Sequence, residues 1–277
     1  MSHNITRKMD LNSTDFCVEV EAPLVAERYK AGNFAVLMTN PHGERIPMSI
    51  MKTEDGKISM FIAKLGKTTK ELYKTLDKFE HVIGPMGNPI NVKKYGNVVV
   101  ASDLVCGHAE NYALCNALSK VEGNHVTSFQ TFATSDMVYP AEMRAEKVCD
   151  EYHLTTEDGS LGEEGHYIDM IEERLEKGEK IDIIFAGGNL SNLQELSEMT
   201  KSYNVPTIVT VRQIMVDASG MCGSCRVFID GKMKLACIDG PMFDAHKVDW
   251  GSALRRPNMF AEKETVAAKK CQEAGRC

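Results

Sequence analysis

The stretch Val216-Asp-Ala-Ser-Gly-Met-Cys-Gly-Ser-Cys-Arg226 says more about this chain than any other segment. In plant-type [2Fe–2S] loops the first three cysteine ligands are spaced C-x4-C-x2-C, and a fourth cysteine follows further along. The same spacing occurs here, with Asp217 in the first position, Cys222 and Cys225 in the next two, and Cys237 as the later residue. The pattern predicts a [2Fe–2S] cluster on these four residues, and therefore electron transfer.

The residues around this loop favour the same interpretation. Asp230-Gly231 is a strong hairpin signal between two short strands, and such a hairpin would return Cys237 to the side of Cys225. Gly220 and Gly223 allow the backbone to wrap closely around a bound group.

Two other interpretations of the cysteines stay open. Cysteine pairs spaced C-x2-C are common in zinc sites, and His246 is then a candidate fourth ligand. Alternatively, the thiols are free core residues, but three cysteines within sixteen residues make this the weakest option. The other cysteines are predicted to be ordinary core or surface residues (Cys17, Cys106, Cys115, Cys149) or exposed thiols of a charged tail (Cys271, Cys277).

Composition limits the protein class. The chain has 277 residues, of which 43% are hydrophobic, enough for a sizeable core divided between domains. The net charge of −7 argues against general nucleic-acid binding, and no apolar run approaches the ~20 residues of a membrane span. The nine cysteines and a polar N-terminus indicate a reducing, cytoplasmic location.

Two regions with different sequence patterns precede the cluster loop. Residues 1–93 contain short extended segments separated by Gly and Pro, with one helix at 68–76, and predict a small antiparallel barrel. Residues 94–213 alternate strands with helices, which predicts a parallel α/β domain resembling nucleotide-binding domains. A cluster lobe at 214–250 and a tail at 251–277 follow. The predicted strands are 18–26, 34–37, 45–51, 57–63, 81–83, 97–101, 125–132, 180–186 and 207–211, and one predicted helix runs from Pro140 to about 150.

Motifs in this order resemble the ferredoxin–NADP reductase superfamily. Arg45-Ile-Pro-Met-Ser49 looks like its first flavin motif, Gly66-Lys-Thr-Thr69 like its second, and Gly84-Pro-Met-Gly87 like the turn that ends the barrel. The loop with Asp217, together with residues 237–244, resembles the small subunits of NADH-dependent reduced ferredoxin:NADP oxidoreductases, also labelled sulfide dehydrogenase-like. The electron-transfer subunit of dihydroorotate dehydrogenase is a more distant likeness, and it normally carries four cysteines.

The resemblance implies FAD on the barrel, bound by Arg45, Pro47, Met48, Ser49, Gly66, Lys67, Thr68 and Thr69. An arginine can fork onto a pyrophosphate, and a helix start with a lysine attracts anions. The Ser49 hydroxyl would hydrogen-bond the flavin near N5, where hydride chemistry occurs, so Ser49 is the candidate catalytic residue.

The chain departs from relatives that bind nicotinamide nucleotides. Those relatives have a glycine-rich turn after the first α/β strand. Here residues 102–110 hold only Gly107, Asp103 brings a carboxylate to the phosphate position, and Glu110 is expected in the first helical turn, where it would complement the helix dipole. Segments 132–137 and 187–192 also depart from the family pattern. We therefore expect NAD(P)H to bind weakly or not at all.

The leading hypothesis is an electron-transfer subunit that carries FAD and a [2Fe–2S] cluster and works with a larger flavin/iron–sulfur redox subunit. The tail Arg255-Arg-Pro-Asn-Met-Phe260 combines cations with large apolar groups, a composition suited to docking a partner, although it could equally pack on its own lobe. One alternative is a ferredoxin reductase-type subunit that oxidises NAD(P)H. The other is a non-catalytic scaffold whose metal loop only docks a partner.

Overall fold

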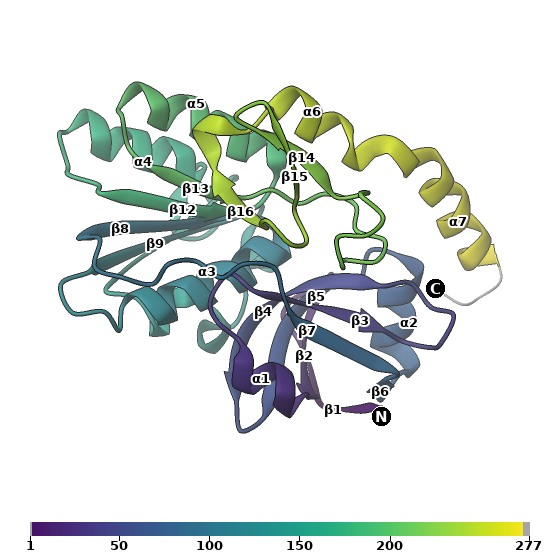
Figure 1. The fold of residues 1–277 in the computed structure, drawn as a ribbon. Coiled ribbons are helices and arrows are strands. Elements are labelled where there is room, and N and C mark those ends of the chain that lie inside the picture. The colour runs from purple at the N-terminus through teal and green to yellow at the C-terminus, as the bar shows by residue number, and fades with distance from the viewer. Residues whose placement is uncertain (1, 274–277) are drawn as a thin grey trace.

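The first sheet of the computed structural model, which describes residues 2–273, is a nearly closed antiparallel barrel (Figure 1). Its seven strands follow the order β6-β1-β2-β5-β4-β3-β7. Apolar side chains that alternate along β2 and β5 point inward and form the barrel core. The strands are β1 (His3–Asp10), β2 (Asp15–Glu21), β3 (Phe34–Met38), β4 (Ile46–Glu54), β5 (Lys57–Ala63), β6 (Lys78–Phe79) and β7 (His81–Met86).

The barrel agrees with the prediction in class but differs in two details. The predicted strand 18–26 ends at Glu21, because Pro23 occupies the first turn of helix α1 (Pro23–Arg28), a position that suits proline. Strand β1 was not predicted, since its polar sequence leaves none of its side chains fully buried. Helix α2 (Lys67–Thr75) lies close to its expected range.

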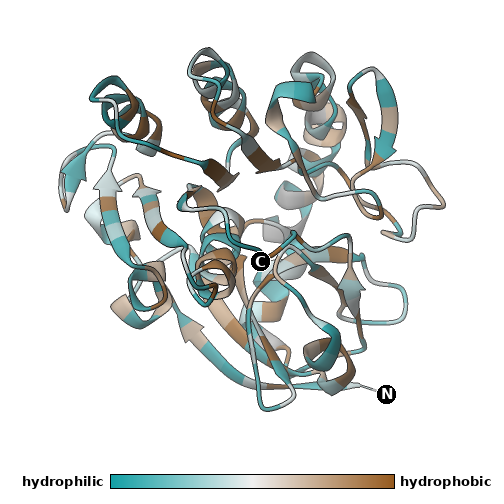
Figure 2. Ribbon diagram, turned by 60° about the vertical axis from the view of Figure 1, so that its left-hand side comes forward, coloured by the Kyte–Doolittle hydropathy of each residue, from teal (hydrophilic) through white to brown (hydrophobic). Residues whose placement is uncertain are grey.

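The second sheet has the order β11-β10-β9-β8-β12-β13-β16 and is parallel except for β16. Figure 2 shows its hydrophobic strands beneath helices that turn their apolar sides inward. The strands are β8 (Asn97–Ser102), β9 (His125–Phe132), β10 (Glu151–Thr156), β11 (Glu163–Glu164), β12 (Ile183–Gly187), β13 (Thr207–Thr210) and β16 (Met242–Asp244). The helices are α3 (Leu104–Leu118), α4 (Tyr167–Glu176) and α5 (Leu190–Ser202).

The predicted helix from Pro140 to about 150 is wrong. This segment forms two 3-10 turns, Ala141–Met143 and Ala145–Lys147, separated at Arg144 by an extended backbone. Met143 and Ala145 are both buried, and side chains two apart do not share one face of a helix. The break at Arg144 lets both point inward.

The C-terminal part packs on the α/β sheet rather than standing apart. Hairpin strands β14 (Arg226–Ile229) and β15 (Lys232–Leu235) share a hydrophobic core with α5 and β13, and β16 covers the edge of β13. Helices α6 (Trp250–Arg255) and α7 (Ala261–Glu273) follow, joined by a 3-10 turn (Pro257–Phe260). Another 3-10 turn, Ala245–Lys247, follows β16, and Ser135–Met137 forms one after β9. The side chain of Cys271 and all of Cys277, predicted as exposed thiols, lie outside the described part.

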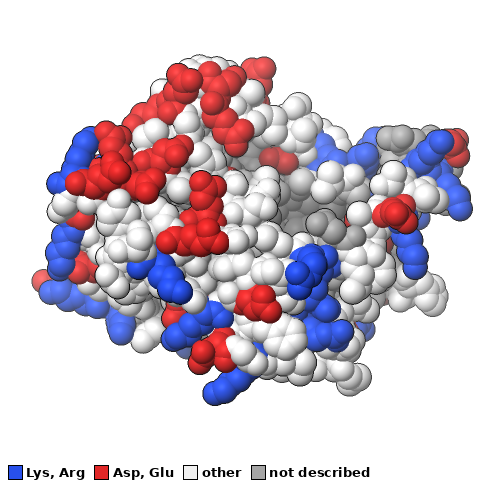
Figure 3. Space-filling view, turned by 90° about the horizontal axis from the view of Figure 1, so that it is seen from above, with Lys and Arg blue, Asp and Glu red and all other residues white. Residues whose placement is uncertain are grey.

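Seen from the helical side, acidic side chains crowd the surface over α4 and α5 (Figure 3). Within residues 2–273, no helix combines the length and apolar character needed to cross a membrane.

Candidate functional site

The hairpin brings two of the predicted cluster ligands together. Asp230 and Gly231 both have positive φ angles, 51° and 69°, which is the backbone of the tight turn expected from this dipeptide. Because β14 and β15 pair across this turn, the Cys225 and Cys237 sulfurs lie 3.2 Å apart, and both side chains are buried. The expected approach of Cys237 to Cys225 is confirmed.

The other two predicted ligands lie on the loop that precedes the hairpin. The Asp217 carboxylate accepts hydrogen bonds from the backbone N–H groups of Ser219 and Cys222, both at 2.9 Å. Cys222 is exposed, so this end of the loop reaches the surface. Gly220 has φ +84°, and a Cβ there would lie 2.7 Å from Ile238, so the tight wrap of this loop requires glycine.

The candidate ligands therefore fall into two pairs: the sulfurs of Cys225 and Cys237 are in contact, and Asp217 is joined to Cys222 through the backbone N–H of Cys222. Among the described residues, no three His, Cys, Asp or Glu side chains gather as ligands of a single metal ion. The His246 Nε2 atom lies 3.0 Å from the Thr200 hydroxyl, in a contact between the 3-10 turn after β16 and α5. A [2Fe–2S] cluster takes two protein ligands on each iron, so donors arranged in pairs fit its demands better than those of zinc.

The tail contacts the cluster loop and also leaves apolar groups exposed. The Arg256 guanidinium donates to the Ser224 carbonyl at 2.9 Å, so part of the segment packs on its own lobe. Met259 is 55% exposed and Phe260 39% exposed. Further large apolar side chains are exposed around the loop: Val216, Met221 and Ile238.

A separate cleft lies where the barrel meets the α/β sheet. Residues of the first flavin motif form one wall on β4, while α3 and the segment after β13 form the other. Helix α3 packs against β4 of the barrel as well as against β8 of the parallel sheet, and so fixes the position of one relative to the other. The lining residues are Phe34, Pro47, Met48, Ser49, Cys106, Glu110, Thr210, Arg212, Gln213, Met215 and Pro241.

This cleft gathers buried polar atoms without partners. Of the eight buried side-chain polar atoms that lack a hydrogen bond among the described residues, four belong to residues that line it. Buried polar groups are normally paired, so a concentration of unpaired ones points to a missing ligand that has donors and acceptors. The four atoms are Glu110 Oε2, Thr210 Oγ1, Arg212 Nη1 and Gln213 Oε1. An isoalloxazine ring, with its polar edge, fits this requirement.

The remaining flavin-motif residues lie near each other at the surface of the barrel. Arg45 is exposed just before β4. The Thr68 hydroxyl donates to the carboxylate of Glu44 at 2.8 Å, which ties the start of α2 to the neighbour of Arg45. Gly66 caps α2 with open space around it, and the Thr69 hydroxyl accepts from the Gly66 N–H at 3.2 Å. Lys67 begins α2 and is exposed, so the two motifs present two cations at one helix start.

The expected position of Glu110 is wrong. Helix α3 begins at Leu104, so Glu110 is its seventh residue and lies beyond the first turn. Its carboxyl faces the barrel, where the Ser49 hydroxyl donates to Oε1 at 2.6 Å. Burial raises the pKa of Glu110 to about 6, and the hydroxyls of Ser49 and Thr210 beside the carboxyl limit that rise. Glu110 therefore belongs to the cleft beside Ser49 rather than to the helix start where a phosphate would bind.

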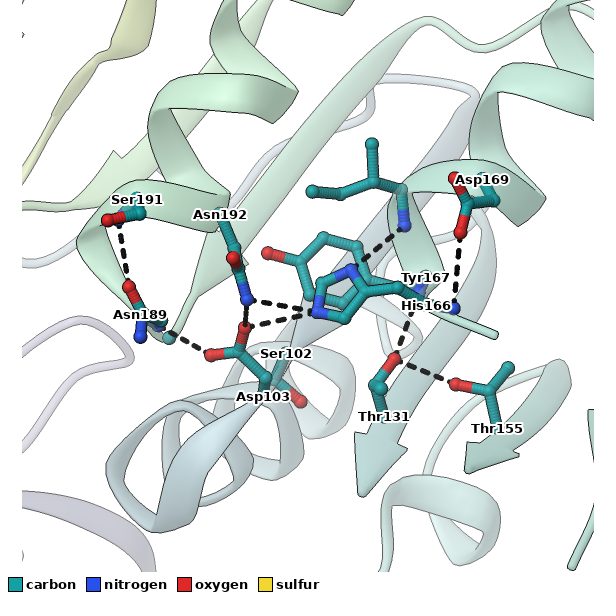
Figure 4. A network of polar contacts seen from close by, with 12 residues as sticks. Ser102, Asp103, Thr131, Thr155, His166, Tyr167, Asp169, Asn189, Ser191 and Asn192 are labelled. Atoms are coloured by element: carbon teal, nitrogen blue, oxygen red, sulfur yellow. Dashed lines mark hydrogen bonds and ion pairs between the residues drawn. The ribbon is translucent and has the colours of Figure 1, made fainter. Parts of the chain in front are cut away.

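Asp103 fills the crevice at the carboxyl ends of β8 and β12. Its carboxylate accepts hydrogen bonds from the Asn189 N–H at 2.5 Å and the Asn192 side chain at 2.6 Å, and lies 3.3 Å from His166 Nε2 (Figure 4). A Cβ on Gly188 would lie 1.9 Å from the Asp103 carboxylate, so glycine permits the approach. Burial alone would raise the pKa of Asp103, but bonds from His166, Asn192 and Asn189 outweigh it and lower the pKa below its ordinary value.

This crevice is the topological switch point of the sheet. The chain leaves β8 for β9 on one side and returns to β12 on the other, and open α/β sheets bind ligands at such a point. Asn189 caps the N-terminus of α5, so the Asp103 carboxylate takes the place that a ligand anion would occupy. Arg212, which lines the cleft, donates to the Gly188 carbonyl at 2.7 Å; burial lowers the pKa of Arg212 to about 10, and the nearby Asp103 carboxylate opposes this shift.

His166 and Asn192 were not predicted as partners of Asp103. Each lies at the start of a helix that follows a strand of the parallel sheet, and the carboxyl ends of such strands meet at one edge. This rule about strand ends could have predicted the site. It brings His166 and Asn192, which are 63 and 89 positions from Asp103, to the same edge of the sheet.

Comparison with known proteins bears on both sites. The family model of the iron–sulfur cluster binding domain of dihydroorotate dehydrogenase B matches residues 212–249, the range that contains the cluster loop. A dihydroorotate dehydrogenase B (NAD(+)) electron transfer subunit homolog of Thermotoga maritima is 34% identical over 269 residues, covering 96% of this chain and 94% of that protein. A probable electron transfer subunit of the same enzyme from Methanopyrus kandleri is also 34% identical, over 78% of this chain and 79% of its own length.

Solved structures agree with these relatives. A chain of the NADH-dependent reduced ferredoxin-NADP oxidoreductase, described in connection with flavin-based electron bifurcation, superposes with a TM-score of 0.88 and 31% identity over 97% of both chains. The ferredoxin reductase of carbazole 1,9a-dioxygenase superposes with a TM-score of 0.61 at 15% identity over 74% of this chain and 66% of that one, a likeness of fold alone. The predicted superfamily and fold class are confirmed.

Proposed function

The chain belongs to the family of the dihydroorotate dehydrogenase B electron transfer subunits, and from this premise we propose that it is the electron-transfer subunit of a heteromeric oxidoreductase, with FAD in the barrel cleft and a [2Fe–2S] cluster on the C-terminal loop. The observation that carries the proposal is that one chain holds both a loop with candidate cluster ligands and a cleft in which buried polar atoms lack hydrogen-bond partners. When bound, the flavin exchanges two electrons and the cluster one at a time, so together they convert between these modes.

For the cluster we propose Asp217, Cys222, Cys225 and Cys237 as ligands. The adjacent thiols of Cys225 and Cys237 would serve one iron, and Asp217 and Cys222, joined through the loop backbone, the other. The hydrogen bond from Arg256 to the loop carbonyl and the tight backbone at Gly220 would hold the loop in its bound form.

For FAD we propose a binding site divided between the two motifs. Pro47, Met48 and Ser49 would lie along the isoalloxazine ring, with the Ser49 hydroxyl toward N5. Arg45 and the helix start at Gly66, Lys67, Thr68 and Thr69 would hold the pyrophosphate, since exposed cations and backbone N–H groups at a helix start suit an anion.

We infer that the crevice of the parallel sheet holds no nicotinamide nucleotide with appreciable affinity. A pyrophosphate would have to displace or face a buried carboxylate that already has three partners. Like charges at close range and the loss of these bonds both oppose binding. Electrons would then reach or leave the flavin through another subunit.

The partner would be a larger flavin/iron–sulfur redox subunit. The exposed Met221 and Ile238 near the cluster loop, with Met259 and Phe260 of the tail, supply apolar contact area close to the exposed Cys222. The described cysteines are free thiols, which suits the reducing cytoplasm.

The proposal is tested by purifying the protein without oxygen and measuring its iron, acid-labile sulfide and flavin. We expect two irons, two sulfides and one FAD per chain, together with the visible absorption of both groups. Zinc without sulfide would overturn the cluster, and a folded protein that neither retains nor takes up FAD would overturn the flavin site. The absence of both groups would instead identify a scaffold.

Replacing Asp217 with Cys tests the ligand set in detail. A carboxylate is a harder ligand than a thiolate, so D217C should retain the cluster but change its reduction potential and electron paramagnetic resonance spectrum. C149S is the matched control, because Cys149 is a half-buried thiol away from the loop. Identical potentials in D217C and the unmodified protein would show that Asp217 does not bind the cluster.

A further inference from the structure

We propose that Glu110, acting through the Ser49 hydroxyl, supplies and recovers the proton that accompanies electron exchange at the flavin, and that this proton enters from a groove beside the C-terminal half of α3. The inference rests on the proposed FAD site. It concerns a residue that the flavin motifs do not include.

The first step is the contact between Glu110 and the flavin wall. Ser49 donates to Glu110 Oε1 at 2.6 Å, a short bond of the kind formed by ionised acceptors. The second oxygen, Oε2, is buried without a partner of good geometry. A carboxyl in this setting can hold a proton on either oxygen, and when protonated it can reverse the bond and donate to the serine. Ser49 can then donate onward into the cleft.

The second step is a path from solvent. A cavity with room for about one water molecule touches Glu110, Ser49 and Tyr29. Tyr29 and Ala113 also line a wide open groove beside the C-terminal half of α3, where Lys30, Lys52 and Lys120 lie. The cavity and the groove therefore adjoin each other at Tyr29 and Ala113, and a water in the cavity would bridge part of the path between the Glu110 carboxyl and groove solvent.

The charges around Glu110 permit both protonation states. The titratable groups that face it are Tyr29 from the connection between α1 and β3, Cys106 on its own helix, and Arg212 after β13. In the groove, Lys52 is paired with Glu54 at 2.9 Å. Among the described residues the carboxyl forms no ion pair, and burial raises its pKa to about 6, close to the pH at which it would exchange protons.

The chemical balance is simple when no nicotinamide delivers a hydride. When bound, the flavin would accept electrons one at a time from the cluster and take up one proton for each pair. Glu110 would pass that proton through Ser49 and regain one from groove water, so the relay by itself leaves the net proton uptake unchanged. The added negative charge of the reduced flavin would raise the pKa of Glu110, so at pH values between its pKa in the oxidised and in the reduced protein the carboxyl would bind one further proton.

The experiment is an equilibrium redox titration of the FAD-loaded protein at several pH values, followed through the flavin absorbance. It compares the unmodified protein with E110Q, which keeps the shape and the bond from Ser49 but cannot titrate. The matched control is E27Q, because Glu27 is an exposed carboxylate on α1 that lines neither the cleft nor the cavity. In an interval that starts near pH 6, the unmodified protein and E27Q should take up one more proton per flavin reduced than E110Q.

A second measurement needs no variant. Infrared difference spectra should contain the carbonyl band of a protonated carboxyl, which disappears as the pH rises through about 6. S49A should keep the equilibrium proton uptake but slow flavin reduction and alter its solvent isotope effect, which a purely structural role of Ser49 would leave unchanged.

The outcomes separate the two claims. Equal proton uptake in E110Q and the unmodified protein, with FAD bound in both, would overturn the role of Glu110 and leave the proposed function intact. The absence of the carboxyl band in the unmodified protein would do the same. A protein that binds no FAD would overturn the proposed function, and this inference with it.

Discussion

Two polar sites lie near each other between the barrel and the parallel sheet, and they differ in how completely their hydrogen bonds are made. In the cleft beside Ser49, four buried polar atoms lack partners. In the crevice at Asp103, the carboxylate has three partners contributed by two helices and a loop (Figure 4). The first site is incomplete without a ligand, and the second is complete without one.

The comparison shows how the chain's own polar groups can complete a crevice of this kind. The Asp103 carboxylate lies at the helix start at Asn189, a position that suits an anion. Gly188 is necessary there, because a side chain would collide with the carboxylate. Glycine at a switch point is therefore evidence for close approach, and the group that approaches has to be found in the structure.

The largest expected effect comes from breaking the completed site. Asp103→Asn places an amide opposite the donors of Asn189 and Asn192, and loses the charge that His166 contacts. Losing one partner of a buried charged network costs about 2 to 4 kcal/mol of the free energy of unfolding. Urea titration of the cofactor-free protein measures this loss, and D136N, at an exposed aspartate, is the control. A change below ~0.5 kcal/mol would contradict the account of the crevice.

A smaller effect is expected at the incomplete site. Arg45→Ala should weaken FAD binding by about 10- to 100-fold, because it removes a charge-assisted contact worth about 1.5 to 3 kcal/mol. The protein without cofactor should be equally stable in both forms, since Arg45 is exposed. Equilibrium dialysis gives the affinity, and R28A, at the exposed end of α1, is the matched variant. Unchanged FAD affinity would exclude Arg45 from the site.

The smallest effect concerns stability against pH. The folded-state pKa of Glu110, about 6, lies above its ordinary value of 4.5, so its contribution is present below pH 4.5 and is lost as the pH rises through about 6. The loss is about 1 to 2 kcal/mol, because a shift of one pKa unit corresponds to about 1.4 kcal/mol. The difference in unfolding free energy between the cofactor-free protein and E110Q should therefore change in this window. If the unfolding free energies of the two proteins changed with pH in parallel, the Glu110 carboxyl would be solvated rather than buried.

Features fixed by neighbouring residues were predictable from the sequence. Asp230-Gly231 set the hairpin, and the alternation of strands and helices set the parallel sheet. The position of Glu110 was missed because it depends on where α3 begins, at Leu104, whose φ of +57° gives no sequence signal. The polar strand β1 was missed because pairing with β2, rather than burial, holds it in the barrel.

The partners of Asp103 could not be predicted from local sequence at all. His166 and Asn192 reach it from α4 and α5, and their convergence follows from the strand order. The same holds for the contact between Glu110 and Ser49, which joins α3 to the barrel. In both sites the motif located the region, and the tertiary contacts decided which side chains meet there.

The central claim is that the cleft takes a flavin while the crevice takes no nicotinamide nucleotide. Calorimetric titration of the FAD-loaded protein with NADH and with NADPH, without oxygen, tests it most directly. The account predicts dissociation constants above about 1 mM and an unchanged flavin absorbance. Micromolar binding of either nucleotide, with bleaching of the flavin band, would show that Asp103 leaves the crevice and that hydride transfer to the flavin persists.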